Sequence, residues 1–336
     1  MSIQESLITY PKRLTLAQTP TPLQKLSRVT TALQGPTIWV KRDDLTGSLL
    51  SGNKVRKLEF TLAQAQEEGA NVLITCGGLQ SNHCRATALL GAQLGLKVHL
   101  VLRGEPDSVA DGNLLLDQLA GAEISTYRPG YYANNLEQLL QETAEQYRAK
   151  GLKPFVIPTG ASDDIGVWGY VNACKELRRD FELHNIQPSH IVVATGSGGT
   201  QAGLTAGAFL YQLGAAVVGM AVCDDEHYFQ TKVMHDLSGW KKRYGLDIDL
   251  AVLDIQVNDN YIGPGYAKAD KAVFDCIQWL AREEGLVLDP VYTGKAFYGL
   301  VSDIKAGKYN HCSDVVFVHT GGIFGVFPQR DQFFQQ

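Results

Sequence analysis

The stretch that decides the fold is HIVVATGSGGTQAGLTAGAFLYQLG, residues 190–214. A β-branched apolar run leads into a glycine-rich loop and then into a helical pattern, which predicts a strand, a loop and a helix. Similar apolar runs recur along the chain at 37–44, 71–78, 97–104, 153–160, 216–222 and 315–322. Strands that alternate with helices predict an α/β protein with parallel sheets covered by helices on both faces.

The loop from Thr195 to Thr200 predicts an anion site. Its glycines leave backbone N–H groups open, its hydroxyls can donate, and a helix begins directly after it. The dinucleotide fingerprint is incomplete because Gln201 stands at its last glycine position, and the loop has no P-loop lysine. The sequence therefore favours a single phosphate group over a nucleotide, with an ordinary tight turn as the structural alternative.

A second unit of the same design, NVLITCGGLQSNHCRATALLGAQLG, occupies residues 71–95. Ser81 and Asn82 can cap its helix, and the same open N–H groups can bind a carboxylate. His83 follows, but it has no histidine four residues away and no carboxylate cluster with metal-ligand spacing. We therefore expect no metal site.

The segment SGNKVRKLEF, residues 51–60, places Lys54 at the start of a helix, where the helix dipole disfavours a cation. Helical spacing sets Lys54 beside an apolar stripe and predicts that Arg56 and Lys57 point away. An amine in a partly apolar site has a lowered pKa, so more of it is in the form that attacks an aldehyde.

Two further expectations concern this helix. Ser51 or Asn53 is expected to cap it. The structural alternative for Lys54 is a lysine that snorkels to solvent or pairs with Asp43 or Asp44 as a structural cation.

Composition excludes several classes of function. The chain has 336 residues, a net charge of -5 and no basic stripe, which disfavours nucleic-acid binding. No apolar run approaches the ~18 residues of a membrane span, and no signal peptide is apparent, so a cytoplasmic location is expected. The six cysteines are widely spaced, which indicates buried, reduced thiols.

Five motifs in order, SGNKVRKLEF, GGLQSNHCR, ATGSGGTQAGL, LDPVYTGKAFYGL and VHTGG, span nearly the whole chain. Together they resemble the pyridoxal-5′-phosphate enzymes related to 1-aminocyclopropane-1-carboxylate deaminase and D-cysteine desulfhydrase. The resemblance implies the tryptophan synthase β-subunit fold (fold type II), with two open twisted α/β domains and the cofactor in the cleft. It implies a large domain of residues 1–53 and 166–336, a small domain of residues 54–165, and a homodimer.

The resemblance also implies roles for individual residues. Lys54 matches the Schiff-base lysine and is the first candidate base, with Ser81 or Tyr292 as alternatives. Asn82 matches the partner of the cofactor's phenolic oxygen, and Ser81 the substrate-contacting serine. The expected phosphate site consists of Thr195, Gly196, Ser197, Gly198, Gly199 and Thr200. The expected ring neighbours are Tyr292, Thr293 and Thr320, and further substrate contacts are Asn82, His83 and Tyr261, which lies in the turn-rich segment NDNYIGPGY.

Thr293 and Thr320 separate two activities within the family. The cyclopropane deaminases have glutamate and leucine there, and a carboxylate beside the pyridine nitrogen strengthens the electron sink needed to open a cyclopropane. Threonine cannot supply that charge, so the sequence predicts β-elimination of D-cysteine to pyruvate, ammonia and hydrogen sulfide. L-cysteate sulfo-lyase and serine or cyclopropane deaminase activity remain as alternatives, and a nicotinamide oxidoreductase or a non-catalytic amino-acid sensor are rivals from other classes.

Overall fold

The computed structural model of the chain describes residues 8–334 and contains two β-sheets. The first has the order β1 (Leu23–Lys25), β2 (Thr37–Lys41), β10 (Asp314–Val318), β7 (His190–Thr195), β8 (Ala216–Ala221) and β9 (Gln256–Asn258). The second has the order β5 (Glu123–Tyr127), β4 (Lys97–Arg103), β3 (Val72–Gly78) and β6 (Pro154–Val156). Every pairing is parallel except β1 with β2, which confirms the predicted α/β class.

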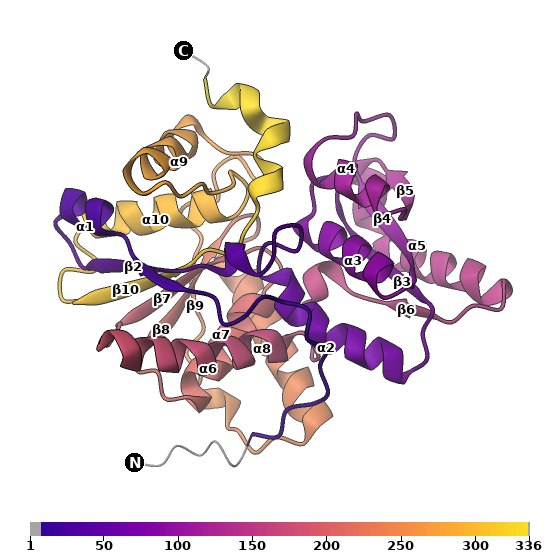
Figure 1. Cartoon of the computed structure of the whole chain (residues 1–336), viewed down its shortest axis with the longest axis horizontal. Coiled ribbons are helices and arrows are strands. Elements are labelled where there is room, and N and C mark those ends of the chain that lie inside the picture. Colours follow the sequence, from indigo (N-terminus) through magenta and orange to yellow (C-terminus); the bar gives the residue numbers. More distant parts are fainter. Residues whose placement is uncertain (1–7, 335–336) are drawn as a thin grey trace.

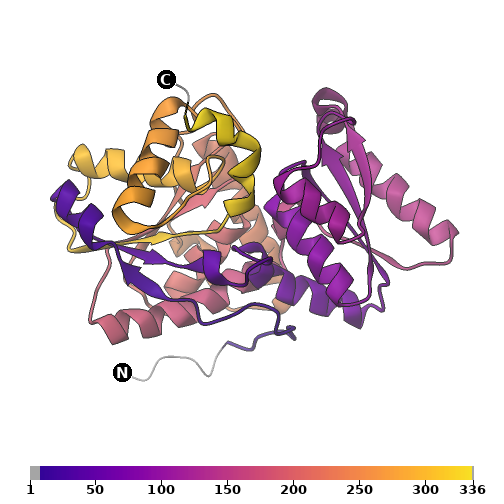
Figure 2. The ribbon, with the colours of Figure 1, turned by 45° about the horizontal axis from the view of Figure 1, so that its top comes forward.

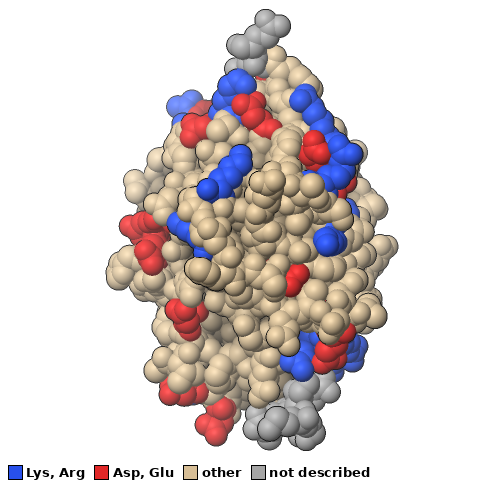
Figure 3. All heavy atoms as spheres, turned by 90° about the vertical axis from the view of Figure 1, so that its left-hand side faces the viewer, with Lys and Arg blue, Asp and Glu red and all other residues tan. Residues whose placement is uncertain are grey.

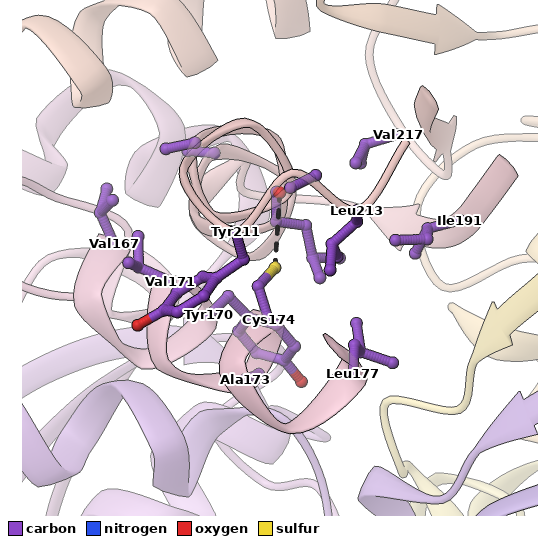
Figure 4. Close-up of a cluster of buried hydrophobic side chains, with 14 of the residues drawn as sticks. Val167, Tyr170, Val171, Ala173, Cys174, Leu177, Ile191, Tyr211, Leu213 and Val217 are labelled. Carbon is purple, nitrogen blue, oxygen red and sulfur yellow. Dashed lines mark hydrogen bonds between the residues drawn. The ribbon is translucent and has the colours of Figure 1, made fainter. Parts of the chain in front are cut away.

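Helices cover both faces of the six-stranded sheet, as Figure 1 shows. One face carries α6 (Val167–His184), α7 (Gly199–Leu210) and α8 (Glu226–Tyr244), and the other α1 (Ser27–Leu33), α9 (Lys271–Glu284) and α10 (Thr293–Lys305). Along β7, Ile191 and Val193 pack on the first face and Val192 and Ala194 on the second, the two-residue period of a strand buried on both sides. Figure 4 shows part of the hydrophobic core on the first face, where side chains of α6 and α7 pack against the sheet.

The four-stranded sheet has its own core. Its faces are covered by α2 (Lys54–Glu67), α3 (Asn82–Gln93) and α4 (Gly112–Leu119) on one side and by α5 (Pro129–Ala149) on the other. The 3-10 helices are η2 (Asp43–Leu45), η3 (Thr159–Ala161), η4 (Leu250–Val252), η5 (Ile323–Gly325) and η6 (Phe327–Gln332). Figure 2 shows the two layered bodies side by side, with α2 between them.

The proposed division assigns all strands of the six-stranded sheet to residues 1–53 and 166–336 and all strands of the smaller sheet to residues 54–165. Helix α2 lies at the boundary, because it packs against α6 as well as against α3. The division therefore stays a prediction, and residues 1–7 and 335–336 of it lie outside the described chain.

Each of the seven apolar runs read from the sequence contains a strand, whereas β1, β5 and β9 had no such signal. All three are edge strands. Strands β1 and β9 have only three residues each, and β5 carries the polar sequence EISTY with no fully buried position. An edge strand buries less surface than a central one, so a purely apolar pattern does not find it.

The charged side chains are mixed in sign on the surface, and the cysteines are mostly buried, as the sequence predicted. In Figure 3, positive and negative side chains are interspersed over one face of the molecule. Within residues 8–334 none of the six cysteines forms a disulfide, and only Cys223 and Cys312 are not fully buried. In the same range we find no helix with the length and hydropathy to cross a membrane, and no group of ligating side chains placed to hold a metal ion.

Candidate active site

A cavity of about 390 Å³ lies where the two sheets face each other, at the carboxyl ends of their strands. That edge is where open parallel sheets bind ligands, and the volume is in the range of a small-molecule site. Among the predicted site residues, those in the cavity wall are Lys54, Ser81, Asn82, His83, Thr195, Gly196, Ser197, Gly198, Thr200, Tyr292 and Thr320. Gly199, Thr293 and Tyr261 are not in the wall.

Lys54 is the first residue of α2, and its amine faces the cavity without a hydrogen-bond partner among residues 8–334. Burial lowers its pKa to about 8, against a weak opposing effect of Cys84. Asp43 instead pairs with Arg56, and Asp44 pairs with Arg42, so the alternative that Lys54 pairs with one of these carboxylates is wrong. The structure therefore places the Lys54 amine in the cavity wall, and its role as the reactive amine stays a prediction.

The capping prediction for α2 is also wrong. Asn53 has helical backbone angles and no side-chain cap bond, and its amide donates to the Thr200 hydroxyl at 2.8 Å instead. The Ser51 carbonyl accepts from Arg85. Ser51 and Asn53, which were expected only to cap the N-terminus of α2, therefore connect the start of α2 to the glycine loop and to α3.

Lys54 should react as an amine at unusually low pH. Its pKa of about 8 means that about a tenth is unprotonated at pH 7 and about half at pH 8, whereas an unperturbed lysine titrates near 10.4. Competitive acetylation of the cofactor-free protein, followed by peptide mass spectrometry, should give a labelling midpoint near pH 8 for Lys54. A midpoint near pH 10 would show that the amine is solvated and not desolvated by the cavity.

The prediction that Arg56 and Lys57 point away from the protein is wrong. Both side chains are buried, at 2% and 0% exposure, because α2 is covered on the far side by α6. The helices approach so closely that a Cβ on Gly169 of α6 would lie 2.7 Å from the Arg56 backbone. Arg56 donates to Asp43 and Glu176, and Lys57 donates to Ser162.

The glycine loop forms a cradle for an anion. Gly198 has a φ of 82°, which opens the turn before α7, and the Thr195 hydroxyl is buried with no partner in the described chain. Behind the loop, Ser162 meets the Ser197 hydroxyl at 2.8 Å and receives a bond from Lys57 at 3.1 Å. The Gly199 N–H donates to Ser162 at 3.2 Å. The unpartnered Thr195 hydroxyl, the remaining N–H groups at the start of α7 and the nearby Lys57 cation are therefore the donors that a phosphate could use.

Sequence reasoning missed Lys57 and Ser162. Lys57 was assigned to the outer face of α2, and the 3-10 helix η3 ends just before Ser162, in a segment without a phosphate-loop pattern. Burial and the neighbouring Lys54 lower the pKa of Lys57 well below its ordinary value, an effect that a bound phosphate would oppose.

At the other side of the cavity, α3 begins as predicted. The Ser81 side chain caps it by accepting from the Cys84 amide, and Asn82 is its first residue. The Asn82 carbonyl oxygen accepts from Arg85 and Asn113 at 3.1 Å each, which leaves its NH₂ group to donate to a ligand. Arg85 and Asn113 are thus positioning residues that the sequence did not indicate.

His83 lies in the cavity wall as a neutral ring. The Thr75 hydroxyl donates to the Ile157 carbonyl, so it accepts from His83 Nε2 at 2.7 Å, and that nitrogen carries the hydrogen. Burial, together with the charges of Lys54 and Lys57, lowers its pKa well below the ordinary value. His83 is therefore a neutral imidazole next to the Lys54 amine and does not add an imidazolium charge to the cavity.

Two tyrosines close the cavity. The Tyr292 ring lies against Gly196, where an added Cβ would come within 3.0 Å, and its hydroxyl is hydrogen-bonded to that of Tyr266. Burial raises the pKa of both phenols. The NDNYIGPGY loop does border the cavity, but through Tyr266 and not through Tyr261.

Tyr261 and Thr293 have structural partners instead. Tyr261 donates to Asp303 at 2.6 Å, which holds it away from the cavity and corrects the substrate-contact prediction. The buried Thr293 hydroxyl donates to Asp289 at 2.7 Å at the start of α10, so it does not reach the cavity directly. Of the two discriminating threonines, only Thr320 lies in the wall.

The fold and cavity define an enzyme class. An open parallel α/β scaffold presents a phosphate cradle and an uncommitted, low-pKa lysine to one cavity, and these residues fit a cofactor with a phosphate and an aldehyde.

Residues 14–321 match the family model described as "Pyridoxal-phosphate dependent enzyme", and the chain belongs to this family. Its cofactor is pyridoxal phosphate, as predicted, and the chain is an enzyme of the D-cysteine desulfhydrase and 1-aminocyclopropane-1-carboxylate deaminase group.

Relatives of known name support the closer grouping. The chain is 43% identical to a putative 1-aminocyclopropane-1-carboxylate deaminase of Thermotoga maritima, over 94% of this chain and 98% of the relative. It is 40% identical to the mitochondrial bifunctional D-cysteine desulfhydrase/1-aminocyclopropane-1-carboxylate deaminase of Arabidopsis thaliana, over 94% and 80%. A crystal structure of an ACC deaminase homologue superposes with a TM-score of 0.87 at 36% identity, covering 97% of this chain and 99% of that one.

Proposed function

We propose that this enzyme catalyses β-elimination of D-cysteine, which with one water gives pyruvate, ammonia and hydrogen sulfide. The observation that carries the proposal is the composition of the cavity wall near Tyr292. Thr320 supplies a hydroxyl to the wall, and Asp224, which is exposed, is the one acidic residue in the wall within residues 8–334. Among the described residues the wall contains no buried carboxylate that could keep the cofactor's ring nitrogen protonated, since the buried Asp289 lies outside it, bonded to Thr293. The site therefore suits a substrate with a good leaving group such as thiolate.

The proposed division of labour follows from the contacts. Pyridoxal phosphate, when bound, supplies an aldehyde that links to an amine and a ring that withdraws electrons from Cα. The Thr195 to Thr200 loop, backed by Lys57, would hold its phosphate, and the Asn82 NH₂ group would hold its phenolic oxygen. Ser81 and the positive end of α3 would bind the substrate carboxylate.

Lys54 would remove the Cα proton. It is the one primary amine that the described part of the chain contributes to the cavity wall, and its pKa of about 8 leaves a useful fraction as free base near neutral pH. The hydrogen-bonded Tyr266 and Tyr292 hydroxyls would supply protons to the departing group, since burial raises the pKa of both and keeps them protonated.

The substrate assignment predicts a ranking of activities. Pyruvate release measured with D-cysteine, L-cysteine, L-cysteate and D-serine, and 2-oxobutanoate release with the cyclopropane amino acid, should give the largest kcat/KM for D-cysteine. The cyclopropane acid should be the poorest, because no described residue of the wall offers a buried carboxylate to support the ring nitrogen. If it exceeds D-cysteine, the deaminase alternative is correct, and if L-cysteate leads, the sulfo-lyase alternative is.

The homodimer implied by the family resemblance is also a proposal. Light scattering of the purified holoenzyme should give a mass near twice the 36.7 kDa of the chain. A mass near that of one chain would refute it.

A further inference from the structure

Arg103 is a cation in the cavity wall that the chemistry above does not use. It is the last residue of β4 and lies opposite Gly78 of β3, where both strands end at the cavity. Its guanidinium lies 4.9 Å from the centre of the Tyr266 ring and 6.0 Å from that of Tyr132. These ring contacts orient the side chain without occupying its N–H donors.

Arg103 has no counter-ion. Throughout residues 8–334 no carboxylate forms an ion pair with it and no acceptor takes a hydrogen bond from its side chain. Three other cations of low exposure have partners: Arg56 pairs with Asp43, Lys232 pairs with Asp236, and Lys295 donates to three carbonyls. A half-buried guanidinium with five free donors facing a cavity is suited to an anionic ligand.

The other anions expected in this cavity already have receptors. The cofactor phosphate has the Thr195 to Thr200 loop with Lys57 behind it, and the substrate carboxylate has Ser81 and the positive end of α3. Arg103 also lies beside Tyr266, whose hydroxyl is bonded to Tyr292. Arg103 therefore adds positive charge next to the two tyrosine hydroxyls that are proposed to donate protons to the leaving group.

We propose that Arg103 recognises a negative charge on the β-substituent of the amino-acid substrate. The site then accepts amino acids whose leaving group is or becomes anionic, such as a thiolate or a sulfonate, in preference to neutral ones. The inference rests on the proposed function only in that the ligand is an amino acid with a β-substituent.

The test uses a pair of nearly isosteric amino acids that have no leaving group. Aspartate and asparagine differ at the β-position mainly in charge and share the α-carboxylate and amine. Their dissociation constants from the holoenzyme, as both enantiomers, are measured by the change in visible absorption on binding. The wild type should bind aspartate about tenfold or more tightly than asparagine, the size expected for a charged hydrogen bond.

Arg103→Met should bring that ratio to about one, and Arg103→Lys should retain part of it, since lysine keeps the charge but loses the planar fork. Both dissociation constants are measured on the same protein, so partial misfolding of a variant would weaken the binding of both ligands and would not change their ratio. A ratio unchanged in Arg103→Met, a ratio near one in the wild type, or equal weakening of both ligands would overturn the proposal. Equal weakening would instead assign Arg103 to the α-carboxylate.

This measurement is separate from the substrate assignment, because neither ligand turns over. D-cysteine could prove a poor substrate while aspartate still binds through Arg103, which would point to sulfonate or another anionic substituent. Conversely, rapid turnover of D-cysteine with no aspartate preference would leave the elimination reaction intact and remove only this role of Arg103.

Discussion

Lys54→Ala is expected to lower kcat for pyruvate release by about a thousandfold or more, the loss associated with removing a general base that is also the covalent anchor. Within residues 8–334 no other primary amine lines the cavity, since Lys57 is turned toward Ser162 behind the glycine loop. The purified variant should lack the visible absorption of the wild type, and borohydride should no longer fix the cofactor to the peptide that contains residue 54.

Two matched variants sharpen this test. Lys54→Arg keeps a cation of similar length, but a guanidinium does not deprotonate, so it should be as inactive as the alanine variant while remaining folded. Lys97→Ala removes an exposed lysine at the start of β4 and should leave activity and absorption unchanged. Normal turnover by Lys54→Ala would exclude the mechanism, whatever the colour of the protein.

Arg56→Met is expected to destabilise the protein by about 3–5 kcal/mol, the cost of leaving a buried charge without its partner. Asp43 is 0% exposed, and Arg56 reaches it through two nitrogens at 2.8 and 2.9 Å while also donating to Glu176. Tyr170 adds a further hydrogen bond to Asp43. The midpoint of urea unfolding of the cofactor-free protein measures the change.

Two control variants distinguish the loss of stability caused by breaking the buried hydrogen-bond network from the effect of removing any charged side chain. Arg56→Lys should recover part of the loss, because an ammonium cannot bridge both carboxylates in the planar geometry of arginine. Asp275→Asn breaks the exposed Lys271–Asp275 pair on α9 and should cost less than about 1 kcal/mol. If Arg56→Met unfolds within about 1 kcal/mol of the wild type, the network does not hold α2 against α6.

The network also predicts a direction of pH dependence. Burial alone would raise the pKa of Asp43. The charge and hydrogen bonds of Arg56, the charge of Lys41 and the Tyr170 hydrogen bond hold that pKa below its ordinary value. A carboxyl whose pKa falls on folding contributes stability above its unfolded pKa of about 3.9 and loses it as the pH drops toward the folded value. The difference in stability between wild type and Arg56→Met should therefore shrink in acid.

The sequence by itself determined the α/β class, the glycine loop and the place of Lys54 at the start of its helix. These features are local, because a strand, a glycine turn and a helix start are specified by consecutive residues. The same holds for Ser81, whose capping role depends only on the helix that follows it. The partly apolar surroundings of Lys54 were also predictable from its place beside the apolar stripe of its own helix, and the structure leaves its side chain partly buried in the cavity wall.

Only the tertiary structure decided which side chains beyond those motifs meet at the cavity. Helical spacing gives the faces of α2, but α6 covers the face that carries Arg56, and Lys57 is buried toward Ser162. Likewise Asp303 on α10 takes the hydroxyl of Tyr261 and leaves Tyr266 to reach Tyr292. Each outcome depends on a partner more than 20 residues away in the chain, so it follows from packing of the folded elements and not from any local pattern.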